Sequence, residues 1–352
     1  MPLIPEAYYS SNPTILIDGE FRGDLSDALG SMVVNLTLRG CAHAELTVSN
    51  WGLPEGGQEP DFLFTDIALG TAVEIQMGQP EDLITIFNGE ITAIEEEYGH
   101  GAPLLTLLLQ DKLHRMARKR QNRTYEEQSP DDIIQALASD LGVQTDIQVS
   151  GITDSWHQIN ESDLAFLLRL CDRFDIAPRL HDGALRARPE ESDSEPHELN
   201  AQDNALSVRL IADLNHQPLN STSQGYNLGS AEAVDYNSAS MTPAPQATTA
   251  ASTLSELSWD SEETVPQPFA RSQAEAEAYA KAHFRRMAKR FVQGDIVCQG
   301  MPTLRSGREI ELSGVSPRME GRYQVVHCTH RFDRRSGFET HLKVNKSDWS
   351  PA

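Results

Sequence analysis

The 352-residue sequence has few cysteines, no long apolar run and no familiar catalytic motif. Its four cysteines are far apart and form no Cys-x-x-Cys pair, which favours reduced thiols over a disulfide framework or a zinc site. No stretch approaches the roughly 18 apolar residues of a membrane span. The start, MPLIPEAYYSSNP, lacks the basic and apolar regions of a secretory signal. We therefore expect no signal peptide, no membrane anchor and synthesis in the cytoplasm.

Catalytic signatures are also missing, since the sequence contains no Gly-x-Ser-x-Gly, His-Glu-x-x-His, P-loop or Gly-x-Gly-x-x-Gly motif. Glu95-Glu96-Glu97 and the acidic run from Glu190 are typical of solvated charge rather than of a catalytic carboxylate pair. His327 and His330, three residues apart on a predicted strand, face opposite sides and make a poor metal pair. We predict no enzymatic activity, no catalytic or metal-binding residue and no cofactor.

Charge is unevenly distributed along this acidic chain, whose formal net charge is −23. Residues 1–100 hold 17 acidic residues and only two basic ones, Arg22 and Arg39. The segment KLHRMARKRQNR, residues 112–123, is basic but lacks the interleaved aromatics of a nucleic-acid site. It is interpreted as a solvated helix face or a contact for an acidic partner. Because an acidic chain repels polyanions, direct nucleic-acid binding is not expected.

The first part of the chain, residues 1–124, is predicted to be an antiparallel β-barrel domain. Apolar and polar residues alternate at 34–38, 44–48 and 73–77, and two further strands are expected within 84–94 and 104–109. Turn signals stand at Asp18-Gly19, Gly56-Gly57, Asn88-Gly89 and 99–101.

Residues 125–190 are predicted to be an α+β insert of two helices and a hairpin. Ser129, Pro130 and Asp132 start the first helix with a capping box, and Gly142 ends it. The second helix spans 162–174 with capping oxygens at residues 160–163. Its expected buried stripe is Leu164, Leu167, Leu168, Cys171 and Phe174. Two short strands follow within 179–188 around Asp182-Gly183. Asp163 and Arg169 are interpreted as support residues or subunit contacts.

Residues 191–352 are predicted to be a second β-barrel domain. Alternating patterns indicate strands at 206–212, 310–312, 323–328 and 338–344. A polar loop is expected at about 218–268, with the Ser-, Thr-, Ala- and Pro-rich stretch 237–258 as its centre. The capping box Ser272-Gln-Ala-Glu275 starts a helix at about 272–290. Gly300–Gly307 lies between strands, which makes phosphate binding improbable there.

Two separated blocks of sequence together resemble the phage late control D family. The first is Asn-Glu-Ser-Asp-Leu-x-Phe-x-x-Arg-Leu at 160–170, followed by an aromatic residue, Asp-Ile and the hairpin. The second comprises Gly-Met-Pro-Thr-Leu-Arg-Ser-Gly at 300–307, Gly-Arg-Tyr-Gln-Val at 321–325, His330 and Gly-Phe-Glu-Thr at 337–340. The family includes the baseplate hubs of contractile phage tails, and the hub part of type VI secretion VgrG spike proteins is similar to it.

This resemblance implies a mainly β protein with two tail-tube-like barrels joined by a helix and hairpin region. It implies a structural baseplate hub, a homotrimer forming a pseudo-sixfold ring between a hexameric inner tube, or a tube initiator, and a trimeric spike. Other baseplate components are expected partners. No β-helix repeats follow the hub, so the spike is expected to be a separate protein. The rival interpretations are a baseplate-associated cell-wall hydrolase and, with less support, a regulatory DNA binder.

Overall fold

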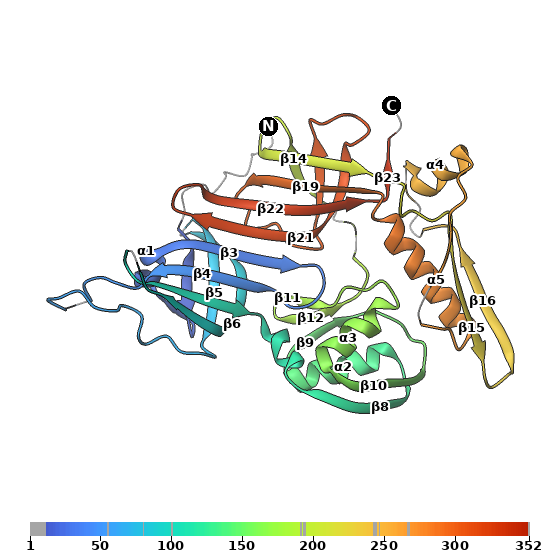
Figure 1. Cartoon of the computed structure of the whole chain (residues 1–352), viewed down its shortest axis with the longest axis horizontal. Helices are drawn as coiled ribbons and strands as arrows, with labels where there is room; N and C mark the ends of the chain where they lie inside the picture. Colours follow the sequence, from blue (N-terminus) through green and yellow to red (C-terminus); the bar gives the residue numbers. More distant parts are fainter. Residues whose placement is uncertain are drawn as a thin grey trace.

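The computed structural model describes residues 12–54, 56–79, 81–99, 101–190, 192, 195–241, 245, 247–265 and 268–350. Residues 1–11, on which the signal-peptide prediction rests, lie outside these ranges. The described chain is mainly antiparallel β-sheet with an α+β insert between two β-rich parts, as predicted (Figure 1). No helix in the described part is both long and apolar enough to cross a membrane.

The N-terminal β unit is an antiparallel sheet built around its own core. Side chains on its strands alternate between buried and exposed positions, as the period-two patterns predict. Leu46, Ile75 and Leu107 are fully buried members of this core. The elements are β1 (Thr14–Ile17), β2 (Glu20–Phe21), α1 (Gly23–Ala28), β3 (Leu29–Thr37), β4 (His43–Ser49), β5 (Ala72–Gln79), β6 (Asp82–Glu97) and β7 (Leu104–Gln110).

The C-terminal β unit has a separate core containing Ile296, Leu312 and Val344. Its predicted strands are all present. The elements of this part are β13 (His197–Asn200), β14 (Ala205–Ala212), β15 (Asn220–Asn227), β16 (Glu232–Ser238), β17 (Thr248–Thr249), α4 (Ala250–Leu257), β18 (Glu262–Thr264), α5 (Gln273–Ala288), β19 (Val292–Gln299), β20 (Glu309–Ser313), β21 (Gly321–Asp333), β22 (Gly337–Lys346) and β23 (Asp348–Trp349).

The two β units have the same topology. In each, five strands, numbered in chain order, lie across the sheet in the order first, second, fifth, fourth, third, namely β3-β4-β7-β6-β5 and β14-β19-β22-β21-β20. In the C-terminal unit, β15 to β18 are inserted between the first and second of these strands. Every pairing within these two sets is antiparallel. The fourth strand is the longest in both sets and carries a register shift, at Ile91/Ala93 in β6 and at Val325/His327 in β21. The chain therefore contains one five-strand unit twice.

A single sheet joins the two units, a feature that the sequence patterns did not indicate. The first strand of the N-terminal unit, β3, pairs with the fourth strand of the C-terminal unit, β21, from Ser31↔Asp333 to Thr37↔His327. Phe332 and Phe338 of the C-terminal strands are buried in the core of the N-terminal unit. Each unit thus depends on the other for part of its sheet and packing.

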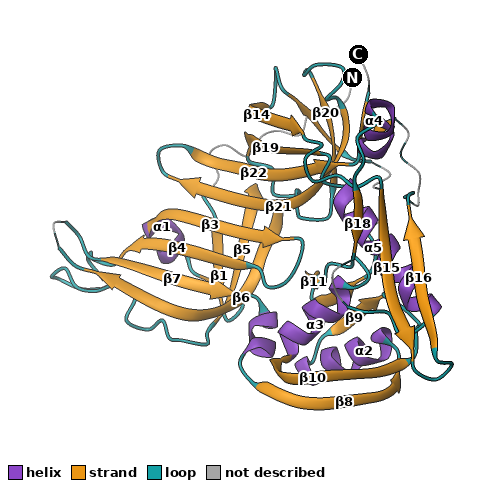
Figure 2. Cartoon of the chain, turned by 45° about the vertical axis from the view of Figure 1, so that its right-hand side comes forward, coloured by secondary structure: helices purple, strands orange, loops and turns teal. Residues whose placement is uncertain are grey.

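The insert lies below the sheet and has a third core (Figure 2). Its α2 starts as predicted, because Ser129 and Asp132 each accept a backbone N–H from the other at 3.2 Å. Gly142 ends that helix with φ 72°. The elements are a 3-10 helix η1 (Lys112–Ala117), β8 (Arg120–Gln128), α2 (Pro130–Leu141), β9 (Gln144–Ile147), β10 (Asp154–Ser162), α3 (Asp163–Asp172), β11 (Arg179–His181) and β12 (Ala184–Ala187).

The second insert helix differs from its prediction in two respects. Ser162 alone caps α3, accepting from the Ala165 N–H at 3.2 Å, whereas residues 160 and 161 belong to β10. Phe166 and Leu170 are fully buried, while the predicted Leu168 is only partly buried. The reason is that α3 contacts η1, α2 and β10, so that its buried face is wider than one stripe and turned away from Leu168. The hairpin around Asp182-Gly183 is confirmed.

The predicted polar loop at 218–268 is wrong. Strands β16, β15 and β18 form a three-stranded sheet there, and α4 begins with a capping box between Thr249 and Ser252. The hairpin β15–β16 packs on α5, with Ser221 and Ser223 buried at the contact. Small polar residues fold here because a neighbouring helix covers them, which composition does not reveal. Residues 242–244, 246, 266 and 267 of this stretch lie outside the described residues.

Two further local signals were overruled by their surroundings. The basic run is not a helix face, because it divides into η1 and strand β8. Ser272 caps α5, but Glu275 accepts from the Arg271 N–H at 2.7 Å instead of completing the box.

Asn88-Gly89, predicted to be a turn, lies inside the continuous strand β6. A Cβ atom at Gly89 would be 2.3 Å from the Gln110 carbonyl oxygen and 2.7 Å from the Phe87 ring. Glycine is therefore needed for close approach of the backbones and not for a turn.

Gly89→Ala is expected to destabilise the protein by about 1–3 kcal/mol, because neither the strand backbone nor the buried ring has room for a methyl group. Urea unfolding followed by tryptophan fluorescence measures the change. Gly151→Ala is the matched control, since a Cβ there meets nothing within 4 Å. Equal unfolding midpoints for the two variants would contradict the close-approach explanation.

Candidate functional site

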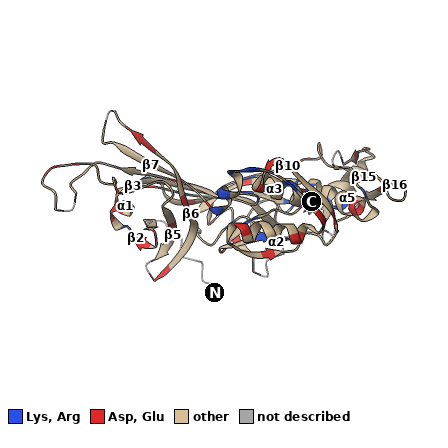
Figure 3. Cartoon of the chain, turned by 90° about the horizontal axis from the view of Figure 1, so that it is seen from below, with Lys and Arg blue, Asp and Glu red and all other residues tan. Residues whose placement is uncertain are grey.

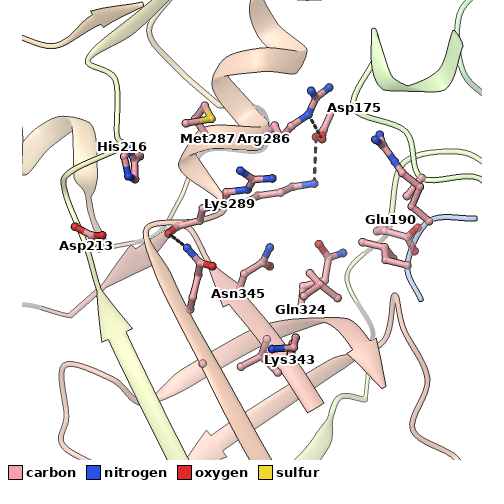
Figure 4. A pocket seen from close by; sticks show the side chains of 18 of the residues that line it. Asp175, Glu190, Asp213, His216, Arg286, Met287, Lys289, Gln324, Lys343 and Asn345 are labelled. Carbon is pink, nitrogen blue, oxygen red and sulfur yellow. Dashed lines mark hydrogen bonds and ion pairs between the residues drawn. The ribbon is translucent and has the colours of Figure 1, made fainter. Parts of the chain in front are cut away.

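A cleft of about 970 Å³ lies between the insert, the C-terminal end of α5 and strands β14, β19, β21 and β22 (Figure 4). Its lining is locally basic in an otherwise acidic chain. The acidic positions are spread widely over the end of the molecule that carries β1 to β7 (Figure 3). The charged lining residues are Arg39, Arg188, Arg209, Arg286, Lys289, Arg290 and Lys343, with Asp175, Glu190, Asp213 and Asp295.

Asp175 organises one wall of this cleft. It follows α3 in a left-handed conformation with φ 56°, and its carboxylate lies 2.8 Å from Arg285 Nε and 3.4 Å from Lys289 Nζ. Arg286 also bonds Asp172 at 3.3 Å. Arg285 and Arg286 lie in the last turn of α5 and Lys289 is its C-cap, where these positive charges also suit the helix dipole. The ion pairs therefore fasten α5 to the insert.

The cleft contains no arrangement that resembles a catalytic or metal centre. Asp175 and Glu190 are each engaged by arginine or lysine side chains. Across the described residues, no group of three His, Cys, Asp or Glu side chains is placed to hold a metal ion. The arrangement is one of paired charges that position elements, with additional cations facing the open space.

The Gly300–Gly307 loop is the point where both β units and the insert meet. Ser306 Oγ donates to the Thr37 carbonyl at 2.9 Å, and Arg305 donates to the Thr85 carbonyl at 2.5 Å, which ties the loop to the N-terminal unit. The Gly307 N–H donates to the Val325 carbonyl at 2.8 Å within the C-terminal unit. The loop thus has a structural role at this junction.

Arg179 and Glu190 form a buried bidentate ion pair against this loop. Their two contacts measure 2.6 and 2.9 Å, and the side chains are only 8% and 9% exposed. Gly307 has φ +91°, and a Cβ there would lie 2.2 Å from an Arg179 nitrogen. The interpretation of Glu190 as solvated charge is therefore wrong, because its partner is the first residue of β11. Glu191, Asp193 and Ser194 of the same run lie outside the described residues.

The two histidines lie on different sides of β21, as predicted. His330 is fully buried, with Nε2 3.0 Å from the Leu304 carbonyl and Nδ1 3.1 Å from Thr340 Oγ1. The carbonyl can only accept, so His330 donates from Nε2. Burial lowers its pKa to about 4. His327 is partly buried near Lys343 and His43, and burial lowers its pKa as well.

The remaining predicted residues are placed in the insert or on the surface. Glu95, Glu96 and Glu97 are exposed, as predicted. Asp163 accepts from Gln158 at 2.7 Å, and Arg169 donates to the His157 carbonyl at 2.7 Å, so both support the insert within the chain. Sequence reasoning missed Arg179, Arg305 and Asp175 because their partners lie on other elements, and no local pattern indicates them.

Several solved structures share this fold. The 43 kDa tail protein of prophage MuSo2 from Shewanella oneidensis has a TM-score of 0.73 at 11% identity, covering 95% of this chain and 98% of that chain. A tail protein from Neisseria meningitidis MC58 has a TM-score of 0.68 at 12% identity, covering 95% and 96% respectively. The E. coli c3393 protein is described as a type VI secretion component similar to T4 bacteriophage tail proteins gp27 and gp5. Its TM-score is 0.59 at 13% identity, covering 92% of this chain and 76% of that one.

The architecture is therefore that of phage tail proteins and of a type VI secretion component. No curated protein sequence matches the chain. A family model does match, described as the Alg8 N-terminal domain, over residues 60–333. The chain belongs to this family.

Arg179→Met is expected to lower the free energy of unfolding by about 3–5 kcal/mol, because it removes the bidentate partner of the buried Glu190 carboxylate and leaves only Arg186, 3.9 Å away. Chemical denaturation measures this loss. Lys281→Met, which removes an exposed pair with Glu277, is the control and should cost under about 1 kcal/mol. The double variant Arg179→Met, Glu190→Leu should recover most of the stability. A single variant no worse than the control would contradict a structural role for this pair.

Stability is expected to fall as the pH drops from about 6.5 towards 4. His330 stays neutral in the folded protein until its pKa of about 4, whereas the unfolded chain takes up the proton near 6.5. Neutral His330 therefore contributes its full stabilisation above pH 6.5, and this contribution is lost as the pH falls below 6.5, by about 3 kcal/mol at most. Unfolding at several pH values should show a flatter dependence in His330→Gln. The exposed His157→Gln control should keep the full slope, and parallel slopes in both variants would refute the assignment.

Proposed function

We propose that this protein is the structural hub of the baseplate of a contractile phage tail or a related injection system. Three copies form a ring with pseudo-sixfold symmetry, which joins a hexameric inner tube, or its initiator, to a separate trimeric spike. The protein has no catalytic role in this proposal and needs no cofactor. It is made in the bacterial cytoplasm and becomes part of the particle's baseplate, in contact with other baseplate components.

The duplicated five-strand unit is the observation that carries the proposal. Two units of the same topology in one chain allow three chains to present six similar units to a sixfold partner. The trimeric face towards the spike then comes from the parts that differ between the two units. In this chain, the insert and the β15–β16 hairpin with α5 are such parts (Figure 2).

The late control D resemblance supports the same function. Its two sequence blocks lie far apart in the chain, yet Arg179 beside the first block packs against Gly307 in the second. The family motifs therefore surround one structural junction. The fold likeness to tail proteins agrees with a role in a tail or a tail-like particle.

We propose three working parts for the hub, namely an N-terminal β domain, the insert and a C-terminal β domain. The boundary between the insert and the C-terminal domain is placed near residue 190. The first boundary is placed near residue 111 rather than 124, because Leu113 and Met116 are buried in the core of the insert.

Co-expression with the neighbouring tube and spike genes, followed by native mass measurement, tests the hub function. The expected species contains three copies of this chain and three of the spike, and the spike expressed without the hub is the control. Failure of the chain to bind either partner at micromolar concentration would remove the proposal.

A further inference from the structure

Each β unit has a free strand edge in the described chain that involves one of its five repeated strands. Strand β14 pairs with β19 on one side only. Beyond Ile91, strand β6 pairs with β7 but has no described partner on its β5 side. Leu206 and Ile211 of β14 are 50% and 57% exposed. Unpaired edges with exposed apolar side chains are ready to accept another strand.

The contact inside the chain shows how such edges meet. Strand β3 is the first of its unit, and it pairs with β21, the fourth of the other unit. Strands β20 and β3 pair with the same edge of β21. β20 pairs with residues 321–324 near the start of β21, and β3 pairs with residues 327–333 beyond its register shift. The corresponding strands that remain free are β14, the first of its unit, and β6, the fourth of its unit.

We propose that β14 of one copy pairs antiparallel with residues 93–97 of β6 in a second copy. This contact repeats between chains the β3–β21 junction that exists within each chain. The inference rests on the proposed homotrimer and specifies the surface through which it forms. A ring of three copies then alternates three internal junctions with three junctions between copies.

The internal repeat also fixes the register of this contact. The register shifts occupy equivalent places in the two units, so Ala93 of β6 is equivalent to His327 of β21, and Glu97 is equivalent to Arg331. In the N-terminal unit, the cross-strand pairs followed from Ile91 through β7 and β4 end at Val34 of β3. In the C-terminal unit, the pairs followed from Val325 through β22 and β19 end at Leu210 of β14. Arg209 is thus equivalent to Val33.

Within the chain, Val33 lies opposite Arg331 and Asn35 lies opposite Thr329. The transferred register therefore places Arg209 opposite Glu97 and Ile211 opposite Glu95 of the neighbouring copy. Arg209 and Glu97 are exposed, and neither makes a side-chain ion pair within the described residues. The register, derived from backbone pairing alone, brings opposite charges together, which favours this contact.

Cysteine cross-linking tests the register directly. Ile211→Cys combined with Glu95→Cys, in hub–spike complexes whose native mass shows three hub copies, should give covalent hub multimers on mild oxidation. Each single variant is a control, and Ile211→Cys with Glu20→Cys tests the other outer edge, β2. Trimers that cross-link no more than these controls would overturn the junction while leaving the hub function standing. Complexes that do not contain three hub copies would overturn both the junction and the hub function.

Charge reversal supplies an independent measurement. Arg209→Glu and Glu97→Arg should each weaken hub association about tenfold through like-charge contacts, and the double variant should restore it. Lys119→Glu, at an exposed position on the insert, makes the same change in net charge as Arg209→Glu and should have no effect. Circular dichroism checks that each variant is folded. Equal losses in the double variant and both single variants would refute the Arg209–Glu97 pairing.

Discussion

The pairing of β3 with β21 is the contact on which the rest of the structure depends. It joins residues 31–37 to residues 327–333, so the end of the chain must return to its beginning before either sheet is complete. Phe332 and Phe338 then fill the core of the N-terminal unit. Closing so long a loop costs entropy, although the cost grows only with the logarithm of loop length. Burial of two aromatic rings and a full strand ladder offsets that cost.

The insert stabilises this junction from below the sheet. The Gly300–Gly307 loop bonds Thr37 at the end of β3, and the buried Arg179–Glu190 pair packs on the same loop. So buried an ion pair mainly fixes the relative positions of its two residues, because burying the charges is favourable only while they face each other. Ion pairs from α5 to Asp172 and Asp175 hold the other side of the insert. The insert therefore fixes the angle at which the two β units meet.

Features whose interactions lie within a few residues could be predicted from the sequence. The caps of α2 at Ser129 and Gly142, and the hairpin at Asp182-Gly183, are of this kind. Features decided by distant neighbours could not. Asn88-Gly89 has a turn sequence, yet the flanking strands keep it extended. Glu190 lies in an acidic run, yet Arg179 neutralises it. The helix α4 escaped notice because polar composition masked its Thr249 cap.

The family resemblance implied two tube-like units, but the sequence patterns alone did not reveal that the two units share one strand order, for the same physical reason. What the two units share is strand order and a register shift in the fourth strand, which backbone hydrogen bonds determine, while their side chains differ. A unit whose first strand pairs with the fourth strand of its neighbour offers both edges for a head-to-tail contact. Two units in one chain make one such contact with each other, so one first-strand edge and one fourth-strand edge remain free. Head-to-tail contacts close into a ring or continue as a filament, depending on the rotation between units. The proposed trimer therefore requires the β3–β21 junction and the proposed contact between chains to share nearly one geometry, which the insert, braced by Arg179 and Glu190, helps to set.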